Sequence, residues 1–546
     1  MGRELSLCIK RDVPALSSTQ FDLAVIGGGI NGAATAREAA LRGWKVALIE
    51  ARDFASGTSS RSSKLVHGGL RYLEQGDFRL VREARHERRR LLKLAPHLVR
   101  RLPFLLPIYR GDTYSPLKIR VGLSLYDWLG NAGACDRHRF FNPKQTLERV
   151  PALRSEGLRA GAAYYDSETD DARLSLENVL DAASHGAGVA NYAQVNRFSK
   201  KNAAGGELTC AEVEDRLTGR KYEVAAKFWV NATGPWVDRV RSLVPGYDGS
   251  KTIRMTKGTH LILPCISSQY ALFAPILPGE RIFLNLPWLG YSLLGTTDTD
   301  YDGDPDAVNP GAGDAEYLLQ ALNRVLREPL RIQNVLGSFA GLRALAAQPG
   351  RSPSANTREY RFHRDSWAAN LVTVCGGKLT TARILAEKLI DSITDKVFSA
   401  TVRNGRGHPS RARPLPGGQT GPFEEFAQSS AAEARKEFGI PQESATRIVC
   451  TYGSRWRKVL EPVRARKQLA DVFPGGAGIV AAEVRFAIHE EGAVTLEDFL
   501  LRRSGLSWSA VLHPELAAAA ADIFAAELGW SAGEKQSALR ALLPEG

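Results

Sequence analysis

The stretch FDLAVIGGGINGAATAREAALRGWKVALIE, residues 21–50, indicates the fold class of the first part of the chain. It begins with an apolar, β-branched run over residues 21–26, which is typical of a buried parallel strand. A glycine-rich turn follows, and then an alanine-rich segment that predicts a helix to about Leu41. A second apolar run over residues 44–49 predicts another strand. This order of strand, turn, helix and strand predicts an α/β unit that binds a dinucleotide.

The glycines of the turn have the spacing G-x-G-x-x-G, at Gly27, Gly29 and Gly32. In this motif the first glycine makes the tight turn, the second lets a pyrophosphate approach the backbone, and the third lets helix and strand pack closely. The helix N-terminus then offers unpaired N–H groups to the phosphates. Glu50 closes the second strand, where its carboxylate can accept hydrogen bonds from an adenosine ribose.

Length and composition set the broad class of the protein. A chain of 546 residues is too long for one compact core, so we expect two or three domains. Hydrophobic residues make up 44% and charged residues 24%, which is ordinary for a soluble globular protein. The six cysteines form no C-x-x-C pair, which fits neither a disulfide framework nor a zinc site and favours a reducing, cytoplasmic compartment.

The net charge of +13 suits three kinds of partner: nucleic acid, an anionic membrane surface or an anionic substrate. The sequence has no helix-turn-helix, zinc-finger or RNA-binding pattern, so we expect no nucleic acid. Two basic stretches have roughly helical apolar spacing and can lie on an anionic bilayer: 79–99 within the basic region 79–110, ended or kinked at Pro96, and 115–130. Each can equally pack on its own domain with a solvated charged face. No apolar segment approaches the length of a membrane span.

The other segments predict a multi-domain order. Residues 1–20 lack the apolar run of a secretory signal and are expected to form a short loose leader. Alternating patterns over 257–264 and 281–297 predict an antiparallel sheet, separate from the parallel one. Residues 370–390 repeat the design of strand, Gly-Gly turn and helix, and 403–422 is typical of a linker. The remainder, rich in Ala, Glu, Leu and Arg, predicts a helical domain.

The acidic stretch DTDYDGD, residues 298–304, has acids at alternate positions, as a calcium-binding loop does. Asn309 stands where such a loop needs a bidentate glutamate, and Pro305 follows early. We therefore interpret the stretch as a turn between strands and predict no metal.

Eight segments resemble, in order and at about the same spacing, those of FAD-dependent glycerol-3-phosphate dehydrogenases of the aerobic, quinone-linked type. They are GGGINGA, TSSRSSKLVHGGLRYLE, VNATGPWVD, KGTHLILP, LLGTTDTDYDGDP, GLRAL, TREY and GGKLTTARILAE. The resemblance runs from about residue 21 to 390 and continues more weakly to the C-terminal part. The SSKLVHGGLRY and GGKLTT segments are its most specific parts, because G-x-G-x-x-G alone occurs in many flavin and nicotinamide enzymes.

The resemblance implies a Rossmann-like FAD-binding domain of the amino-acid-oxidase type, an antiparallel-sheet substrate domain and a C-terminal helical domain. The expected bounds are 21–110, 150–250 and 335–400 for the first, 111–149 and 251–334 for the second, and 405–546 for the third. The implied reaction oxidises sn-glycerol 3-phosphate to dihydroxyacetone phosphate by hydride transfer from C2 to flavin N5. The implied partners are a quinone, the inner face of the cell membrane and a second copy of the chain.

The resemblance also assigns residues to the cofactor. The serine- and glycine-rich segment 58–74 is expected to pass the flavin and give it backbone and hydroxyl donors. The expected cofactor contacts are Gly27, Gly29, Asn31, Gly32, Glu50, Ser59, Ser60, Ser63, Lys64, His67, Gly68, Gly69, Ala232, Thr233, Gly234, Gly377, Lys378, Leu379 and Thr380.

A glycerol phosphate needs charge-assisted donors, and arginine suits them because its planar fork binds two oxygens. The resemblance places five residues at the substrate: Arg71, Tyr72, Arg343, Arg358 and Lys378. For Arg358, which Glu359 follows, a surface salt bridge is an equal alternative.

For chemistry we expect His260, Arg343 and Lys378, with His260 as the base because histidine titrates near working pH. His67 is the second candidate and is expected to border the flavin. Two departures from the family pattern, Ala344 in place of proline and the loop 346–356, leave the arginines in place but alter the segment between them.

Three alternatives stay open at this point. One is a related FAD oxidoreductase acting on an amino acid or a 2-hydroxy acid. Another is an oxygen-using glycerol-phosphate oxidase. The third is a flavin-binding membrane adaptor without enzymatic activity.

Overall fold

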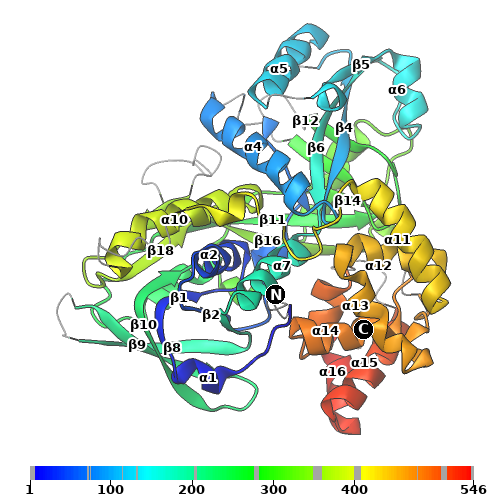
Figure 1. Ribbon diagram of the computed structural model, residues 1–546. Coiled ribbons are helices and arrows are strands. Elements are labelled where there is room, and N and C mark those ends of the chain that lie inside the picture. Colours follow the sequence, from blue (N-terminus) through cyan, green and yellow to red (C-terminus); the bar gives the residue numbers. More distant parts are fainter. Residues whose placement is uncertain are drawn as a thin grey trace.

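The computed structural model describes residues 7–70, 73, 76–112, 115–130, 133–201, 206–275, 282–347, 360–398, 407–475, 478–505 and 513–542. Figure 1 shows two sheet regions, one above the other, with a group of helices to the right of the lower one.

The lower sheet contains the parallel core. Its strand order is β17-β18-β10-β1-β2-β7, with β9 on β10 and β8 on β9. The strands are β1 (Gln20–Ile26), β2 (Val46–Ile49), β7 (Gly188–Ala190), β8 (Ala193–Lys200), β9 (Leu208–Asp215), β10 (Lys221–Asn231), β17 (Arg361–His363) and β18 (Leu371–Cys375). β1 pairs in parallel with β10 and β2, and its apolar side chains are buried because helices cover the sheet. These helices include α2 (Ile30–Leu41), α7 (Asp171–Ser184) and α10 (Ala382–Val397).

The upper sheet is mostly antiparallel. Its order is β15-β11-β14-β13-β12-β4-β6-β3, with β16 on β11 and β5 on β6. The strands are β3 (Leu65–Val66), β4 (Val99–Tyr109), β5 (Arg139–Phe141), β6 (Leu158–Thr169), β11 (Ile253–Leu263), β12 (Ala271–Pro275), β13 (Ile282–Trp288), β14 (Tyr291–Gly295), β15 (Thr299–Asp300) and β16 (Gly337–Ala346). Its helices are α4 (Phe78–Leu94), α5 (Pro116–Leu129), α6 (Pro143–Arg149) and α9 (Asp314–Asn323).

The C-terminal helices have an apolar core of their own. They are α11 (Phe423–Phe438), α12 (Gln442–Tyr452), α13 (Trp456–Leu460), α14 (Ala481–Glu491), a π-helical turn (Asp498–Arg503), α15 (Pro514–Leu528) and α16 (Ala532–Leu542). Buried ion pairs join them to the lower region, notably Asp53 with Arg502 and Arg503, and Arg173 with Glu491.

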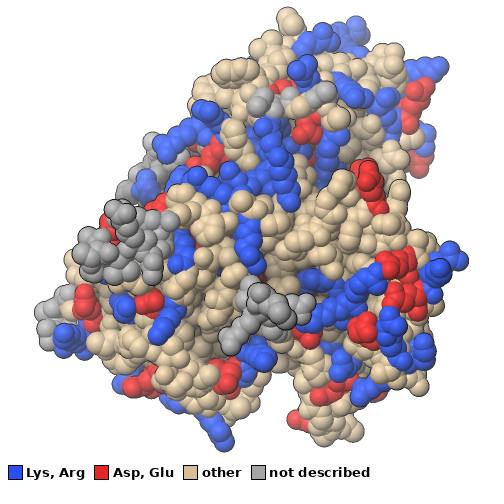
Figure 2. All heavy atoms as spheres, in the orientation of Figure 1, with Lys and Arg blue, Asp and Glu red and all other residues tan. Residues whose placement is uncertain are grey.

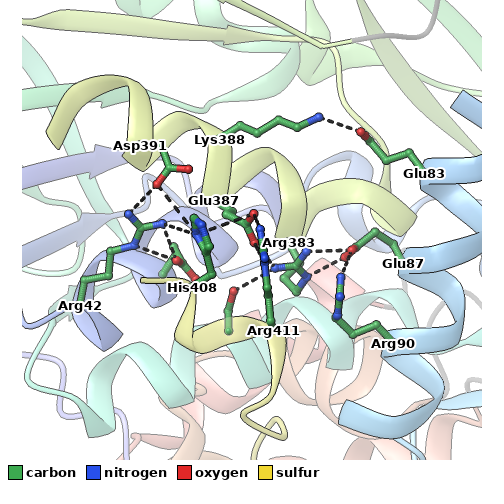
Figure 3. Close-up of polar contacts among 12 residues, drawn as sticks. Arg42, Glu83, Glu87, Arg90, Arg383, Glu387, Lys388, Asp391, His408 and Arg411 are labelled. Carbon is green, nitrogen blue, oxygen red and sulfur yellow. Dashed lines mark hydrogen bonds and ion pairs between the residues drawn. The ribbon is translucent and has the colours of Figure 1, made fainter. Parts of the chain in front are cut away.

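A second network of ion pairs fixes α10 to its surroundings (Figure 3). Buried Arg383 of α10 binds both oxygens of Glu87 on α4, at 2.7 and 2.8 Å. Arg383 also reaches Glu387 at 2.7 Å, and Arg411 of the following segment binds the same carboxylate. The start of α10 is therefore held against α4 of the upper region.

The predicted fold class is confirmed. Four strands whose residues were expected in the FAD-binding domain belong to the upper sheet instead: β3, β4, β6 and β16. The reason is that β4 and β6 pair with each other along almost their whole length, and β16 pairs with β11. Such long-range pairing decides sheet membership and leaves no local pattern.

The expected loose leader over residues 1–20 is also wrong for the described residues 7–20. Asp12 caps a short helix, α1 (Val13–Ser17), by accepting a hydrogen bond from the Ala15 N–H at 2.9 Å. Val13 and Leu16 of this helix are buried against the lower sheet, and buried Ile9 donates its N–H to the Glu490 carbonyl. Apolar burial thus anchors this segment.

Candidate active site

A cavity of about 740 Å³ lies where the carboxyl ends of β1, β2, β10 and β18 meet the upper sheet. This size is within the range of small-molecule and cofactor sites. Open α/β sheets bind ligands at the carboxyl ends of their strands, because loops and helix N-termini converge there. β11 and β16 of the upper sheet close the other side.

The G-x-G-x-x-G turn forms one end of the cavity. Gly27 has a φ of +103°, a conformation that favours glycine, and a Cβ there would lie 2.7 Å from the Ala232 carbonyl oxygen. Gly29 lines the cavity at the start of α2. Gly32 does not line it. A Cβ on Gly32 would lie 1.8 Å from the Gly27 carbonyl oxygen, so this glycine allows α2 to pack on the turn.

Glu50 lies at the carboxyl end of β2 and lines the same end. Its carboxylate accepts hydrogen bonds from the Gly28 N–H at 2.6 Å and the Arg52 N–H at 2.9 Å. Burial raises the pKa of this carboxyl, against the effect of the two backbone donors. Each carboxylate oxygen has a second lone pair, so the group can still accept a hydroxyl of a ribose.

The segment 58–70 runs along the cavity, and four of its predicted cofactor residues line it: Ser59, Ser63, His67 and Gly69. Ser59 Oγ accepts the N–H of Ile30 at 2.9 Å, which fixes the segment to the start of α2.

Three other predicted cofactor residues of the same segment, Ser60, Lys64 and Gly68, are not among the residues that line the cavity. Lys64 has a φ of +56°, which turns its side chain into the protein. Its ammonium group donates to the Ser60 carbonyl at 2.6 Å and pairs with buried Asp171.

Neighbouring side chains occupy the space that a side chain on Gly68 would need. The Gly68 N–H donates to Asp166 at 3.1 Å, and an added Cβ would meet the Tyr126 hydroxyl at 2.3 Å. Ser60, Lys64 and Gly68 therefore shape the loop from behind.

A second glycine turn follows β18. Gly377 has a φ of +104°, and a Cβ there would lie 2.6 Å from the Asn31 side chain. Asn31 Nδ2 donates to the Gly376 carbonyl at 3.1 Å, so this turn is tied to the first one. The predicted residues after the turn (Lys378, Leu379 and Thr380) line the cavity, as do Ala232, Thr233 and Gly234 after β10.

Two of the predicted substrate residues, Arg343 and Lys378, line the cavity together with His260. Arg343 lies on β16 and donates to the Thr296 hydroxyl at 3.1 Å and to Asp298 at 3.3 Å. Arg71, Tyr72 and Arg358 lie outside the described residues.

His260 is buried on β11 and stacks on Phe339. Burial, with the positive charges of Arg343 and Lys64, lowers its pKa to about 3, so the ring is neutral at physiological pH. Its Nε2 lies 2.8 Å from Ser63 Oγ. Its Nδ1 is buried without a hydrogen-bond partner among the residues that the structure describes.

Several lining residues were not predicted from the sequence. Asp166, Arg52, Trp236, Arg239 and Asp306 all line the cavity. Trp236 lies inside the VNATGPWVD segment and Asp306 directly follows LLGTTDTDYDGDP. Their position in or beside segments that resemble the family is therefore the signal that could have predicted them.

The residues present fit a bound FAD. Gly27 and Gly29 leave the backbone open to a pyrophosphate beside the N-terminus of α2. Among the described residues, Asn31 Oδ1 at the second glycine turn is buried and lacks a hydrogen-bond partner, which a ligand donor can supply.

Three of the four acids of the 298–304 stretch pair with arginines: Asp298 with Arg343, Asp300 with Arg254 and Asp304 with Arg239. Elsewhere, Glu387, Asp391 and His408 bring one ligand atom each within 4.8 Å of one another (Figure 3). Arg383 and Arg411 bind Glu387, and Arg42 binds Asp391 at 2.7 Å. These guanidinium groups oppose binding of a further cation there.

Comparison with known proteins gives matches over nearly the whole chain. Residues 22–392 match the family model described as FAD dependent oxidoreductase, and residues 409–535 match that of the C-terminal domain of alpha-glycerophosphate oxidase.

A glycerol-3-phosphate dehydrogenase of Synechocystis sp. is 36% identical over 515 residues, which cover 91% of each chain. An aerobic glycerol-3-phosphate dehydrogenase of Bacillus subtilis is 35% identical, over 90% of this chain and 88% of its own. The crystal structure of a glycerol-3-phosphate dehydrogenase from Bacillus halodurans complexed with FAD superimposes with a TM-score of 0.77 at 30% identity, covering 97% of this chain and 95% of that one.

Proposed function

Because the chain belongs to the family of FAD-dependent glycerol-3-phosphate dehydrogenases and its cofactor is FAD, we propose that it oxidises sn-glycerol 3-phosphate to dihydroxyacetone phosphate and passes the electrons to a membrane quinone. The observation that carries this proposal is that one cavity combines two groups of residues. The glycine turns and Glu50 suit a dinucleotide, and Arg343, Lys378 and His260 suit an anionic substrate and its proton.

The cations fit a phosphorylated substrate. Glycerol phosphate carries nearly two negative charges, and an enclosed site must satisfy its oxygens with charged donors. Arg343 donates hydrogen bonds to Asp298 and to the Thr296 hydroxyl, and these contacts fix the direction of its guanidinium group. An unphosphorylated polyol offers these cations no charged oxygen, so we expect it to bind more weakly.

FAD, when bound, supplies the acceptor for the hydride that leaves C2 of the substrate, at flavin N5. The hydroxyl proton on the same carbon needs an acceptor, and we assign this role to His260, whose neutral ring lines the cavity. Ser63 Oγ, which lies 2.8 Å from His260 Nε2 and also lines the cavity, can relay the proton to this nitrogen. A bound phosphate dianion would offset the charge of Arg343, which helps to lower the pKa of His260.

A quinone suits another part of the cavity. Its wall on the upper sheet is apolar and aromatic, formed by Leu65, Leu70, Phe104, Tyr164, Phe273 and Leu284. A small polar substrate makes no use of such a wall, whereas a hydrophobic acceptor does.

The outer face of α5 fits attachment to a membrane surface. Leu117, Val121 and Trp128 are exposed and, at 100° per residue, point in one direction, while Leu123 and Tyr126 are buried on the opposite side. Exposed Lys118 and Arg120 flank the apolar face. Figure 2 shows lysine and arginine side chains gathered over the upper region that carries α4 and α5. This combination is typical of a helix that lies in the interface of an anionic bilayer.

Among the described residues, no helix has the length and apolar character needed to span a bilayer. Co-sedimentation with vesicles that contain anionic lipid, compared with neutral vesicles, tests the attachment. A Trp128→Ser variant should bind the anionic vesicles more weakly. The homodimer that the resemblance implied stays a prediction, which light scattering can check.

An Arg343→Ala variant tests substrate recognition. We expect it to retain FAD but to lose about a hundredfold in kcat/KM for glycerol 3-phosphate, since a charge-assisted hydrogen bond contributes about 1.5–3 kcal/mol. The matched control is Arg254→Ala, an arginine on neighbouring β11 that pairs with Asp300 outside the cavity. If both variants turn over alike, Arg343 does not bind the substrate.

The choice of acceptor is tested separately. Reoxidation of the reduced enzyme by a short-chain quinone should be much faster than by dissolved oxygen. Faster reoxidation by oxygen would favour the oxidase alternative.

A further inference from the structure

A cluster of four side chains crosses the rim of the cavity beside Glu50. Asp306, in a short 3-10 turn (Pro305–Ala307) of the upper region, accepts hydrogen bonds from three donors of the lower region. One oxygen accepts from the Trp236 indole N–H at 2.7 Å and from Arg52, and the other accepts from Arg239 at 2.8 Å. We refer to Arg52, Trp236, Arg239 and Asp306 as the rim cluster.

Further contacts connect the members of the rim cluster. Arg239 uses its second amino group to bind Asp304 at 2.8 Å, and Asp304 in turn accepts the N–H of Asp306 at 2.9 Å. The guanidinium group of Arg52 lies over the Trp236 ring, 5.6 Å from its centre. All four side chains line the cavity and are partly exposed to solvent, which places them at its edge.

The two sides of the rim cluster belong to different parts of the fold. Arg52 follows β2, two residues after Glu50, and Trp236 and Arg239 follow β10, so all three are fixed to the lower sheet. Asp306 comes from the loop between β15 and α9 of the upper region. The Asp306 carboxylate therefore joins both regions beside Glu50 and the glycine turn, and Asp304 adds a second ion pair to Arg239.

We propose that Asp306 is the centre of an electrostatic clasp that retains FAD by closing the rim of the cavity beside Glu50. The clasp has no part in the chemistry; its opening limits the rate at which the cofactor leaves. This inference rests on FAD as the cofactor and does not depend on which substrate is oxidised.

The partial exposure of the rim cluster predicts how it responds to salt. Ion pairs in contact with solvent are screened, because the Debye length falls from about 10 Å at 0.1 M to about 3 Å at 1 M ionic strength. Salt should therefore loosen the clasp and speed the release of FAD from the wild-type protein.

The test is the rate of FAD release from the purified holoenzyme, followed without substrate by the rise in fluorescence of free flavin after dilution. We expect Asp306→Asn to release FAD about tenfold faster than wild type at low salt. High salt should raise the wild-type rate toward that of the variant and should change the variant's rate little. The control is Asp300→Asn, whose carboxylate lies at the end of β15, just before this loop, and pairs with Arg254 away from the cavity. It should release FAD at the wild-type rate.

The proposal is overturned if Asp306→Asn releases FAD at the wild-type rate, or if it keeps the salt dependence of the wild type. If Asp306→Asn proves too unstable to purify, Arg239→Gln provides the same test. Arg239 is half-exposed, so its substitution removes the contacts to Asp306 and Asp304 without leaving a buried charge. Wild-type release from Arg239→Gln would equally overturn the clasp. If Asp306→Asn loses substrate turnover but releases FAD at the wild-type rate, Asp306 acts in the proposed reaction and the clasp is excluded.

Discussion

Replacing Asp53 by asparagine should undock the C-terminal helices from the FAD-binding region. Asp53 is fully buried and accepts hydrogen bonds from Arg502, from both amino groups of Arg503, and from Asn191 at 3.2 Å. Asparagine has nearly the same shape but no charge, and its amide would face guanidinium groups. Removing one partner of a buried ion pair costs about 3–5 kcal/mol, because the remaining charge is left buried and uncompensated.

The matched control is Asp391→Asn. Asp391 also pairs with an arginine, Arg42, at 2.7 Å, but its side chain is 46% exposed (Figure 3). An exposed pair contributes about 0.2–1 kcal/mol. The two variants therefore make the same chemical change at sites that differ in burial.

The assay is urea unfolding of the FAD-free proteins, followed in parallel by circular dichroism and tryptophan fluorescence, so that separate unfolding of the C-terminal helices shows as non-coincident transitions. With a slope of about 3 kcal/mol per M, the first transition of Asp53→Asn should move down by about 1–2 M, and that of Asp391→Asn by less than about 0.4 M. Equal shifts in the two variants would refute the argument from burial.

Three further predictions concern the site and its supports. The pKa of His260 is about 3 without substrate, and a bound phosphate offsets only the smaller contribution of Arg343, because burial is the largest cause of the shift. The rate of flavin reduction at saturating substrate should therefore show no inflection near pH 6.5, and His260→Asn should slow it about a hundredfold with FAD still bound; an inflection that disappears in the variant would contradict this. Gly32→Ala should abolish the yellow colour of the purified protein, because its methyl group would lie 1.8 Å from the Gly27 carbonyl oxygen, whereas Gly122→Ala, with no neighbour within 4 Å, should load FAD normally. Burial alone would raise the pKa of Glu387, but hydrogen bonds from Arg411 and Arg383 outweigh burial and hold the pKa at about 2. The stability that this carboxylate contributes is therefore complete above pH 4.5 and is lost as the pH falls toward 2. The difference in thermal midpoint between wild type and Glu387→Gln should shrink over that range, and a constant difference would count against the pairing.

The part of the fold that local patterns specify could be predicted from the sequence. The strand, glycine turn, helix and strand of residues 20–49 follow from the run of β-branched residues, the glycine spacing and the alanine-rich helix, all within thirty residues. The helical nature of α4 and α5 also followed from apolar periodicity. Local sequence patterns could not assign β4 to the upper sheet, because its partner strands β6 and β12 are far away in sequence. Only the pairing with these strands determines which sheet β4 joins.

The site shows the same division. Glycine turns and Glu50 line the cavity because their positions are set by neighbouring strands. Lys64 belongs to the SSKLVHGGLRY segment, but its ammonium group binds buried Asp171 and does not line the cavity. Its positive φ, which the sequence motif does not reveal, accompanies this orientation. Asp306 and Trp236 escaped prediction because two regions of the fold must meet before they become neighbours.

The measurement that tests the central claim most directly is anaerobic reduction of the bound flavin. The purified holoenzyme, freed of oxygen, should lose its visible absorbance on addition of one equivalent of sn-glycerol 3-phosphate, and should keep it on addition of glycerol, an amino acid or a 2-hydroxy acid at the same concentration. A spectrum that stays oxidised with glycerol 3-phosphate, or that bleaches equally with glycerol, would contradict a site built to recognise a phosphorylated alcohol.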